Sequence, residues 1–535
     1  MLLTAIKVKL AALVVVAGID TDELKTLSPE MKSVLEQLAI DQKDDKKDLN
    51  AVMTEAVKKV NDLATAGDKD ANYALGRWTV TGVLQGAQLE QTIAFYKTAA
   101  DKGQVPAMSE LGQIMLQAYS QDAGKVAEAV EMIQKAEAGG DRAARRLLAN
   151  LHLNGVAKLE KSAEKARDLL VKGSEGGDGE ATFMLHQLYS VGVTGSTILK
   201  DDKKALELLK KAAEEQSNPV AMSTLGARLF NGDQPTEGGA ALVEKNPENA
   251  MKMFTQAADK GNPAANRLLA QIHEEGLGGQ KKDLKKALEF YSKAANGRDP
   301  EALFRMGVAS EQGWMDADSK EVLVQPNAKN ALDLYRLAAQ NNDLRALYNV
   351  GVYYENGNVV DKDVDKAFEL FKRAAESGVP QAMQKVGLAY QNGQGVKQDL
   401  VAAKSWFEAG SNANFAPSQL SLGAMYEMGS GVGANAGAAA NQYSLAADQG
   451  LPLAMLRLAS MYERGIATPK NEPDFVKAWN YAKQAVDASQ NADVAVQYLT
   501  ALEKLMNDEQ KAQAKKVFEA AKKPATPAAA PAATK

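Results

Sequence analysis

The sequence contains no cysteine, few aromatic residues and only three histidines. The absence of cysteine excludes disulfide bonds, thiolate nucleophiles and metal sites with sulfur ligands, and it leaves the redox compartment undetermined. Aromatic residues make up 6% of the chain and apolar residues 45%, with Ala and Leu dominant. We therefore expect closely packed helices instead of a β-rich fold or a large aromatic core.

Charge of one sign is not in excess, because 63 Lys and Arg residues stand against 68 Asp and Glu residues and the two signs are interspersed. The sequence therefore lacks the basic patch that binding of nucleic acid requires. It also lacks a G-x-S-x-G nucleophile motif and a G-x4-GK-[ST] phosphate loop. We expect a non-enzymatic protein without catalytic residues, cofactor or nucleic-acid partner.

Long apolar runs are missing too. Lys7 and Lys9 precede an apolar run from Leu10 to Ala17, which is too short to span a bilayer and is typical of a secretory signal peptide cleaved after Ala17. We expect a periplasmic or secreted protein without an integral membrane segment once residues 1–17 are removed. The alternative is that this segment is the amphipathic first helix of a cytoplasmic protein.

The chain contains an internal repeat, which explains how 535 residues fold without one oversized core. The segments Val350–Pro380, Val386–Pro417 and Leu422–Pro452 match almost position for position. A glycine marks each unit at intervals of 36 to 44 residues from Gly155 onward. Including a degenerate unit around Gly112, the sequence predicts about eleven repeats over residues 71–491.

Each repeat is predicted to be a helical hairpin. Ala382, Val386, Gly387 and Tyr390 have helical spacing and precede Gly393, which favours a helix that stops at this glycine. The second helix is predicted over residues 361–378, on the apolar stripe of Ala367, Leu370, Phe371, Ala374 and Ala375. We expect helix to exceed about 60% of the chain with no sheet, against roughly one third in globular domains.

Small residues recur inside the predicted helices. Glycine in a helix costs roughly 1 kcal/mol relative to alanine, so its repeated use predicts that a facing helix approaches too closely for a side chain. The glycines concerned are Gly76, Gly112, Gly226, Gly307, Gly351, Gly387 and Gly423.

The unit resembles the Sel-one-like repeat (SLR), a relative of the tetratricopeptide repeat. The pattern A-x3-LG-x2-Y-x2-G-x-GV followed by D-x2-KA-x2-WY-x-KAA-x2-G is similar to Ala346–Gly378 and Ala382–Asn414. The resemblance implies an all-α, right-handed α/α superhelical solenoid that acts as an adaptor, with no catalytic residues. The departures are Ala149, Ala270, Ala459 and His186 at the glycine of the first helix, and Gly410 and Ser411 at the alanine pair of the second.

A repeat array needs terminal units that cover its apolar ends. We expect an N-terminal helical cap over residues 18–70, a C-terminal helical cap over 492–521, and a disordered Ala/Pro-rich tail over 522–535.

The residues that could bind metal have simpler interpretations. His152 and His273 occupy a position that is tyrosine in other repeats, so we expect them to pack as aromatic substitutes, and His186 replaces a glycine. Asp361, Asp363 and Asp365 lack the glycine and closing glutamate of a calcium loop. We expect aspartate capping a helix here, and no metal site.

Two repeats carry insertions, Gly232–Pro247 and Gly313–Asn327. Trp314 and Met315 in the second insertion have no counterpart in the repeat pattern, and large exposed apolar residues are enriched at binding surfaces. We therefore expect a scaffold that binds a protein or peptide partner along its concave face, with Trp314 and Met315 in contact with the partner. The alternative is a cell-envelope or carbohydrate-binding factor that uses the concave face of the solenoid. The alternative for this loop is a surface insertion that the repeat tolerates.

Overall fold

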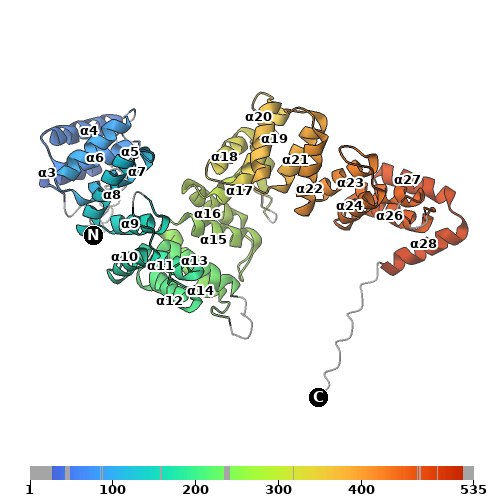
Figure 1. Cartoon of the computed structure of the whole chain (residues 1–535), viewed down its shortest axis with the longest axis horizontal. Coiled ribbons are helices and arrows are strands. Elements are labelled where there is room, and N and C mark those ends of the chain that lie inside the picture. Colours follow the sequence, from blue (N-terminus) through green and yellow to red (C-terminus); the bar gives the residue numbers. More distant parts are fainter. Residues whose placement is uncertain are drawn as a thin grey trace, which may run out of the picture. The chain divides into compact units, whose positions relative to one another are not determined.

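The computed structural model describes residues 27–41, 49–82, 84, 86, 88–156, 159–233, 241–316, 319–466, 468, 471–490 and 492–521. Helices contain 74% of these residues, which confirms the expected all-α fold. Consecutive helices pack against each other in pairs, as an α-solenoid requires (Figure 1). The chain divides into two compact units, residues 1–260 and 261–535.

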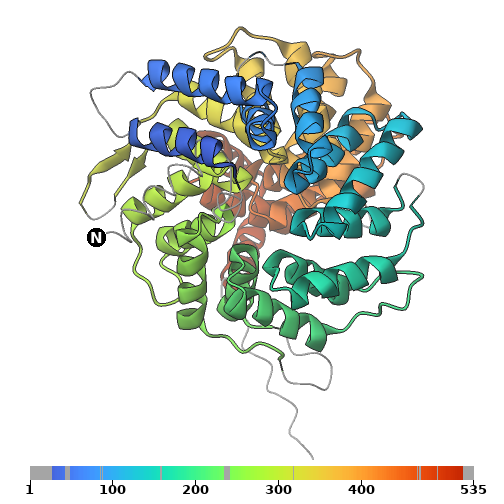
Figure 2. The same cartoon turned by 90° about the vertical axis from the view of Figure 1, so that its left-hand side faces the viewer.

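The first unit begins with two helices and continues with five helical hairpins in its described part (Figure 2). The initial pair is α3 (Pro29–Asp41) and α4 (Leu49–Thr65). The hairpins are α5 (Lys69–Val80) with α6 (Leu89–Asp101), α7 (Val105–Ala118) with α8 (Ala123–Ala138), α9 (Arg142–Asn154) with α10 (Ala163–Glu175), α11 (Gly179–Val191) with α12 (Asp202–Lys210), and α13 (Pro219–Asn231) with α14 (Pro247–Asp259). Helix α12 continues into a single π turn, η1 (Lys211–Glu215).

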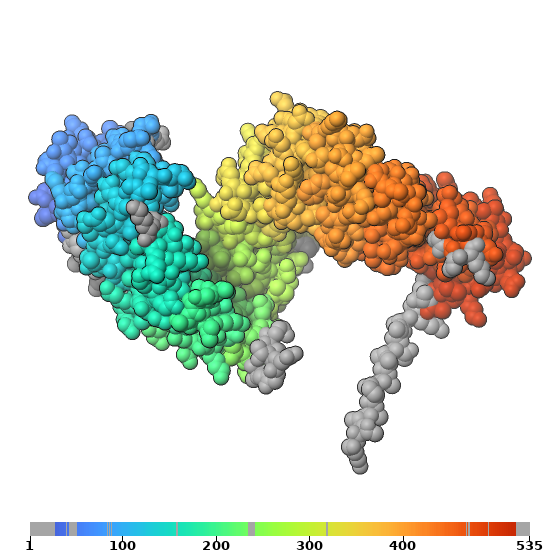
Figure 3. Space-filling view, viewed as in Figure 1, coloured from blue at the N-terminus to red at the C-terminus, as the bar shows by residue number. Residues whose placement is uncertain are grey.

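The second unit contains six hairpins and two final helices within its described residues. The hairpins are α15 (Pro263–Glu275) with α16 (Leu284–Asn296), α17 (Pro300–Gln312) with α18 (Ala328–Gln340), α19 (Leu344–Asn356) with α20 (Val364–Glu376), α21 (Pro380–Asn392) with α22 (Leu400–Asn412), α23 (Ala416–Met428) with α24 (Ala436–Asp448), and α25 (Pro452–Glu463) with α26 (Phe475–Ala488). The chain continues with α27 (Asp493–Leu505) and α28 (Asp508–Ala521). Within each unit, consecutive repeats form consecutive bands in the space-filling view (Figure 3).

Helix ends follow the capping rules that the sequence predicts. Helix α21 ends at Gly393 in the left-handed conformation, with φ 68° and ψ 40°. Asp363 caps α20 by accepting a hydrogen bond from the Lys366 amide at 2.9 Å. Helix α20 therefore starts at Val364, three residues later than expected at Asp361, because Asp363 has extended backbone as a capping residue does.

The helical glycines lie where the second helix of the same repeat comes closest. A Cβ added at Gly351 would lie 2.7 Å from the Phe371 ring, and one at Gly307 would lie 2.6 Å from Tyr335. The same close approach occurs at Gly76 with Tyr96, Gly112 with Ile133, Gly226 with Phe254, Gly387 with Phe407 and Gly423 with Tyr443. The structure therefore confirms that glycine permits close helix packing, and it shows that the facing group is usually an aromatic ring.

A second set of glycines joins neighbouring repeats. A Cβ added at Gly395 would lie 2.6 Å from the carbonyl oxygen of Val364, the first residue of α20. Gly431 has the same relation to Leu400, the first residue of α22, with a distance of 2.5 Å. The turn of each of these repeats therefore rests on the start of the second helix of the preceding repeat.

The expectation of no sheet was wrong. Strands β1 (Trp314–Met315) and β2 (Val322–Val324) form an antiparallel hairpin in the insertion between α17 and α18. The short apolar run at residues 322–324 gives a partner to β1, so the inserted chain pairs its own backbone groups instead of leaving them to water. This strand pair forms the 313–327 loop, of which residues 317 and 318 are not described.

The N-terminal helices cover the apolar end of the first hairpin. Met31, Leu35 and Val60 pack with Leu75 and Trp78 in one buried cluster. A polar contact adds to it, because the Ser28 amide donates to the Asp70 carboxylate at 2.7 Å and the Gln104 side chain donates to it at 2.9 Å. Asp70 is 2% exposed, and burial raises the pKa of its carboxyl group above the ordinary value, although the Ser28 hydrogen bond acts in the opposite direction.

We expect replacement of Asp70 with Asn to remove part of the pH dependence of stability. Because the pKa of Asp70 is higher in the folded state, the stability linked to its proton is fully present below the unfolded pKa and is lost as pH rises through the folded pKa. The difference in unfolding free energy between Asp70→Asn and the unaltered chain should therefore grow in favour of the variant as pH rises.

Urea unfolding at a series of pH values measures this difference. Asp68, Lys69 and Lys32 act on the same carboxyl group and remain in place. Asp101→Asn, at an exposed position of the same repeat, is the control and should leave the slope unchanged. If the difference in unfolding free energy between Asp70→Asn and the unaltered chain did not change with pH, burial would not raise the pKa of Asp70.

Candidate functional site

A carboxylate recurs near the end of the first helix, two residues before the marker glycine. In several repeats it accepts a hydrogen bond from a tyrosine of the second helix. Tyr291 donates to Glu274 at 2.7 Å, and Tyr443 donates to Glu427 at 2.7 Å. Burial and the nearby carboxylate raise the pKa of both tyrosines, so each hydroxyl stays protonated and acts as the donor.

A cation or donor from the next repeat completes the arrangement. Arg305 lies 3.2 Å from Glu274, and Lys385 lies 2.6 Å from Glu355. These side chains connect consecutive repeats through polar contacts beside the glycine–aromatic packing. The repeated unit therefore contains a built-in place for one carboxylate, one hydroxyl and one cation.

The α19/α20 repeat lacks the hydroxyl. Phe371 occupies the position of Tyr291 and Tyr443, while Glu355 is retained. The ring is placed as in the tyrosine repeats, because a Cβ at Gly351 would lie 2.7, 2.9 and 3.3 Å from the Phe371 ring atoms Cε1, Cδ1 and Cζ. The corresponding distances from Gly307 to Tyr335 are 2.6, 2.7 and 3.2 Å. Glu355 therefore keeps its cation partner but has no phenolic donor from Phe371.

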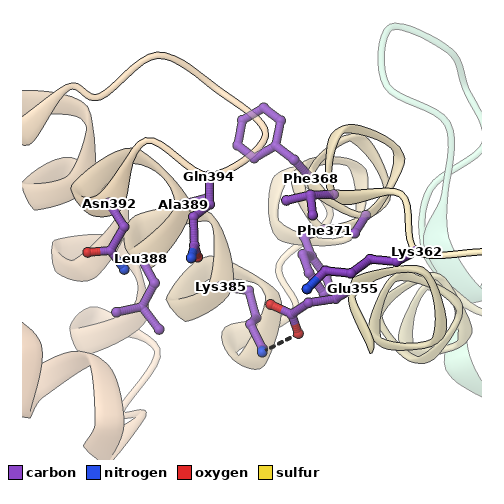
Figure 4. Close-up of a pocket in the computed structure, with 11 residues that line it drawn as sticks. Glu355, Lys362, Phe368, Phe371, Lys385, Leu388, Ala389, Asn392 and Gln394 are labelled. Atoms are coloured by element: carbon purple, nitrogen blue, oxygen red, sulfur yellow. Dashed lines mark hydrogen bonds and ion pairs between the residues drawn. The ribbon is translucent and has the colours of Figure 1, made fainter. Parts of the chain in front are cut away.

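A cavity of about 310 Å³ lies beside Glu355 and Phe371, between α20 and α21 (Figure 4). This volume is at the lower end of the range for ligand pockets. The side chains around it combine three charged groups with apolar and amide groups. They belong to Glu355, Lys362, Val364, Ala367, Phe368, Phe371, Lys385, Leu388, Ala389, Asn392 and Gln394.

The predicted partner-binding residues Trp314 and Met315 lie together in β1. Met315 is 55% exposed. Trp314 is partly buried, and its ring contacts Tyr291 edge to face with centroids 6.1 Å apart. Only Met315 is thus free of the helical core, while Trp314 joins the 313–327 loop to the preceding repeat. Neither residue lies in the cavity beside Glu355.

The other insertion, Gly232–Pro247, is only partly described, since residues 234–240 lie outside the described ranges. Its described ends are tied together, because the Asp233 amide donates to the Val243 carbonyl at 2.9 Å. Val243 is buried, and Arg228 forms an ion pair with Asp233. These contacts hold the base of the insertion against α13.

The three histidines are buried in separate repeats. His273 stacks on Phe290 with centroids 5.8 Å apart, and burial lowers its pKa. His152 lies within 3.2 Å of the Glu160 carbonyl. His186 lies 2.8 Å from the Ala205 carbonyl, and burial lowers its pKa. Burial among the helices accounts for all three positions, and the lowered pKa values favour the neutral form of His186 and His273.

Metal-binding side chains do not gather in the described ranges. No group of three or more His, Asp or Glu side chains is placed there to hold an ion. Of the three aspartates around the start of α20, Asp363 caps the helix and Asp365 lies in its first turn. Asp361 is exposed.

The Sel1 repeat family model matches ten segments that together cover more than half of the chain. The chain belongs to the Sel1 repeat family. The matched segments are residues 69–104, 142–178, 187–217, 219–262, 263–299, 300–343, 344–379, 380–415, 416–451 and 452–499. The α7/α8 hairpin lies between the first two and corresponds to the degenerate unit around Gly112. Sel1 repeat proteins are generally protein-interaction scaffolds, and the family fold is generally non-catalytic.

Two relatives are similar to part of this chain. The chitin synthase regulator SKT5 of Saccharomyces cerevisiae is 30% identical over 167 residues, which are 31% of this chain and 21% of the relative. An exopolysaccharide production negative regulator of Rhizobium leguminosarum bv. viciae is 27% identical over 158 residues, or 28% of this chain and 56% of the relative. The chain thus spans about a fifth and about half of the length of these relatives.

The fold is similar to that of c5321, a protective antigen present in uropathogenic Escherichia coli strains that displays an SLR fold. The match to its crystal structure covers 87% of this chain and 94% of the c5321 chain, with 23% identity and a TM-score of 0.54. Within the described ranges, none of the helices combines the length and apolar character that crossing a bilayer requires.

The sequence interpretation missed the Glu355 cavity. A signal was present in the sequence of this chain. Where a repeat has a glutamate two residues before the marker glycine and an aromatic residue at the position of Phe371, that aromatic residue is usually tyrosine. The pair of Glu355 with Phe371 breaks that rule. The next repeat has Phe407 as well but carries Gln391 in place of the glutamate.

Proposed function

We propose that this Sel1 repeat protein is an exported, non-catalytic scaffold that binds a protein or peptide partner. The observation that supports this proposal is that each hairpin uses its glycines, alanines and aromatic rings for packing on its neighbours. The features that depart from the repeat, the β hairpin with Met315 and the cavity beside Glu355, are accessible and differ from unit to unit. Partner specificity resides in such positions.

Affinity purification after chemical crosslinking in the native host tests the scaffold function. A protein partner that crosslinks to residues of the second unit, and that is recovered at a fixed ratio, is the expected result. Recovery of the chain alone, under conditions in which a known complex of the same host is captured, would contradict the proposal.

We expect alanine at Trp314 and Met315 to weaken partner binding by about 1 to 2 kcal/mol or more, as loss of an anchor does. Because Trp314 contacts Tyr291, the double variant should also lose some stability, whereas Met315→Ala alone should not. Calorimetric titration with the crosslinked partner measures the affinity, and thermal unfolding measures the stability.

Leu337→Ala is the matched control for Met315→Ala. Leu337 is 45% exposed on α18, outside the β1/β2 hairpin. If Leu337→Ala and Met315→Ala lowered affinity equally, the 313–327 loop would have no special role in binding.

A polysaccharide-related role is the second candidate function. The names of both relatives describe regulators of polysaccharide production, of chitin synthase in one and of exopolysaccharide in the other. This favours a partner from the cell envelope, either an envelope protein or the polymer itself. Parallel pull-downs with envelope polymers and with envelope proteins separate the two, since retention by polymer alone would favour a carbohydrate-binding factor.

Export is the part of the proposal that rests on residues 1–17, which lie outside the described residues. We expect mature protein isolated from the native host to begin at Gly18, because cleavage after Ala17 follows a short apolar run. N-terminal sequencing or intact mass measures this directly. A chain that retains Met1 to Ala17 in the cytoplasmic fraction would be inconsistent with export.

A further inference from the structure

We propose that the cavity between α20 and α21 binds an acidic side chain together with an adjacent large apolar side chain from an internal segment of a partner protein. The inference rests on the proposed scaffold function, because it names the chemistry of the partner. It is carried by three observations on the cavity: the missing hydroxyl, the arrangement of charge and the apolar wall.

Phe371 leaves Glu355, at the edge of the cavity, without the phenolic donor that other repeats supply. In the α15/α16 repeat the Tyr291 hydroxyl lies 2.7 Å from Glu274 and Arg305 lies 3.2 Å from it. At the equivalent position the Phe371 ring has the same placement against its glycine but ends in a C–H group. Glu355 therefore lacks the hydrogen bond that Glu274 receives from the second helix of its own repeat.

The charges of the wall favour an anion. Lys362 and Lys385 supply two ammonium groups, and Glu355 supplies one carboxylate. Lys385 is paired with Glu355 at 2.6 Å. Lys362 forms no ion pair with any residue that the structure describes, and Figure 4 shows its side chain extending into the cavity toward Glu355. A second carboxylate placed near Lys362 would balance the charge, whereas a cation would meet two like charges.

The rest of the wall favours an apolar neighbour for that carboxylate. Phe368 and Leu388 are partly buried and line the cavity together with Ala389. Asn392 and Gln394 place amide groups at the same cavity, where they can bond to the backbone of an extended segment. A large apolar side chain would cover the two hydrophobic residues, as the central anchor of an interface does.

Ligand-observed NMR with small probes on the full chain tests whether the cavity binds an acidic side chain beside an apolar one. The probes are N-acetyl-aspartyl-phenylalaninamide, which places the acid inside a chain, its uncharged asparaginyl analogue, and N-acetylphenylalanine, which carries a terminal carboxylate. We expect the aspartyl probe to bind at least about tenfold more tightly than the asparaginyl probe, because only the aspartyl probe has a charge for Lys362.

Two variants with matched controls locate the binding. Lys362→Gln should weaken the aspartyl probe at least about fivefold, whereas Lys282→Gln, at the equivalent position of the α15/α16 repeat, should leave it unchanged. Phe371→Tyr should have the same effect as Lys362→Gln by adding a hydroxyl that donates to Glu355. Phe407→Tyr, in the next repeat and outside the cavity, is its control. Thermal unfolding of each variant shows that the fold is retained.

The outcomes separate this inference from the scaffold function. Equal binding of the aspartyl and asparaginyl probes, or binding that Lys362→Gln and Phe371→Tyr do not weaken, would overturn the acidic–apolar pair. Binding of N-acetylphenylalanine alone would overturn an internal source, because a chain terminus would then be the ligand. A crosslinked partner that Lys362→Gln still retains at full affinity would leave the scaffold function standing and remove the cavity from it.

Discussion

Replacement of Gly431 with alanine should lower the free energy of unfolding by about 3 kcal/mol or more, the largest loss that we expect from one added methyl group. Gly431 has φ 67°, in the left-handed region that costs an L-residue roughly 1 to 2 kcal/mol. The new Cβ would also lie 2.5 Å from the Leu400 carbonyl oxygen. That oxygen is backbone of α22, so relief requires the two repeats to move apart.

Two glycines of the same repeat separate the two causes. Gly450 has φ 85° but open space where a Cβ would lie, so Gly450→Ala should show the conformational cost alone. Gly433 has open space and no positive φ, so Gly433→Ala should be nearly neutral or slightly stabilising. Urea unfolding followed by circular dichroism measures all three. Equal losses at Gly431 and Gly450 would show that the contact between repeats contributes nothing.

Deletion of residues 1–67 should unfold the first hairpin and promote aggregation. The deletion removes Met31, Leu35 and Val60, which cover Leu75 and Trp78. Exposing side chains of this kind costs about 1.5 to 3 kcal/mol each. Exposure of Leu75 and Trp78 should therefore lower the free energy of opening of α5, as hydrogen exchange measures it, by about 3 to 6 kcal/mol. Repeats far from the deletion should keep theirs, because each repeat contacts only its neighbours.

Hydrogen exchange resolved by helix measures this gradient of protection. Leu35→Ala, at a position that is 1% exposed, should reproduce part of the loss in α5. Ile40→Ala, at a position that is 46% exposed in the same helix, is the control. A uniform loss of protection from α5 to α26 would mean that the array unfolds as one cooperative block.

The repeat architecture could be predicted from the sequence because the same residue types recur at the same positions in each repeat. Gly393 predicted the end of a helix, and Gly351 and Gly387 predicted close helix contacts, all of which the structure confirms. These effects depend on one residue and its nearest neighbours. Their repetition at a fixed period made the signal strong.

The candidate site could not be predicted in the same way. The cavity is lined by residues of two consecutive repeats, and the ion pair of Lys385 with Glu355 joins those repeats across it. The β hairpin depends on pairing Trp314 with Val324 across an insertion that has no periodicity. Local propensity carries no information on such non-local arrangements.

The rule that each repeat contacts its neighbours also concerns mechanical load. The marker glycines Gly357, Gly393, Gly429 and Gly465 are 36 residues apart, so loss of one hairpin releases roughly 120 Å of extended chain. Under tension the array can therefore lengthen by the same amount for each hairpin that unfolds, while the neighbouring hairpins remain folded. A partner attached to one hairpin would thus stay attached while a distant hairpin absorbs tension.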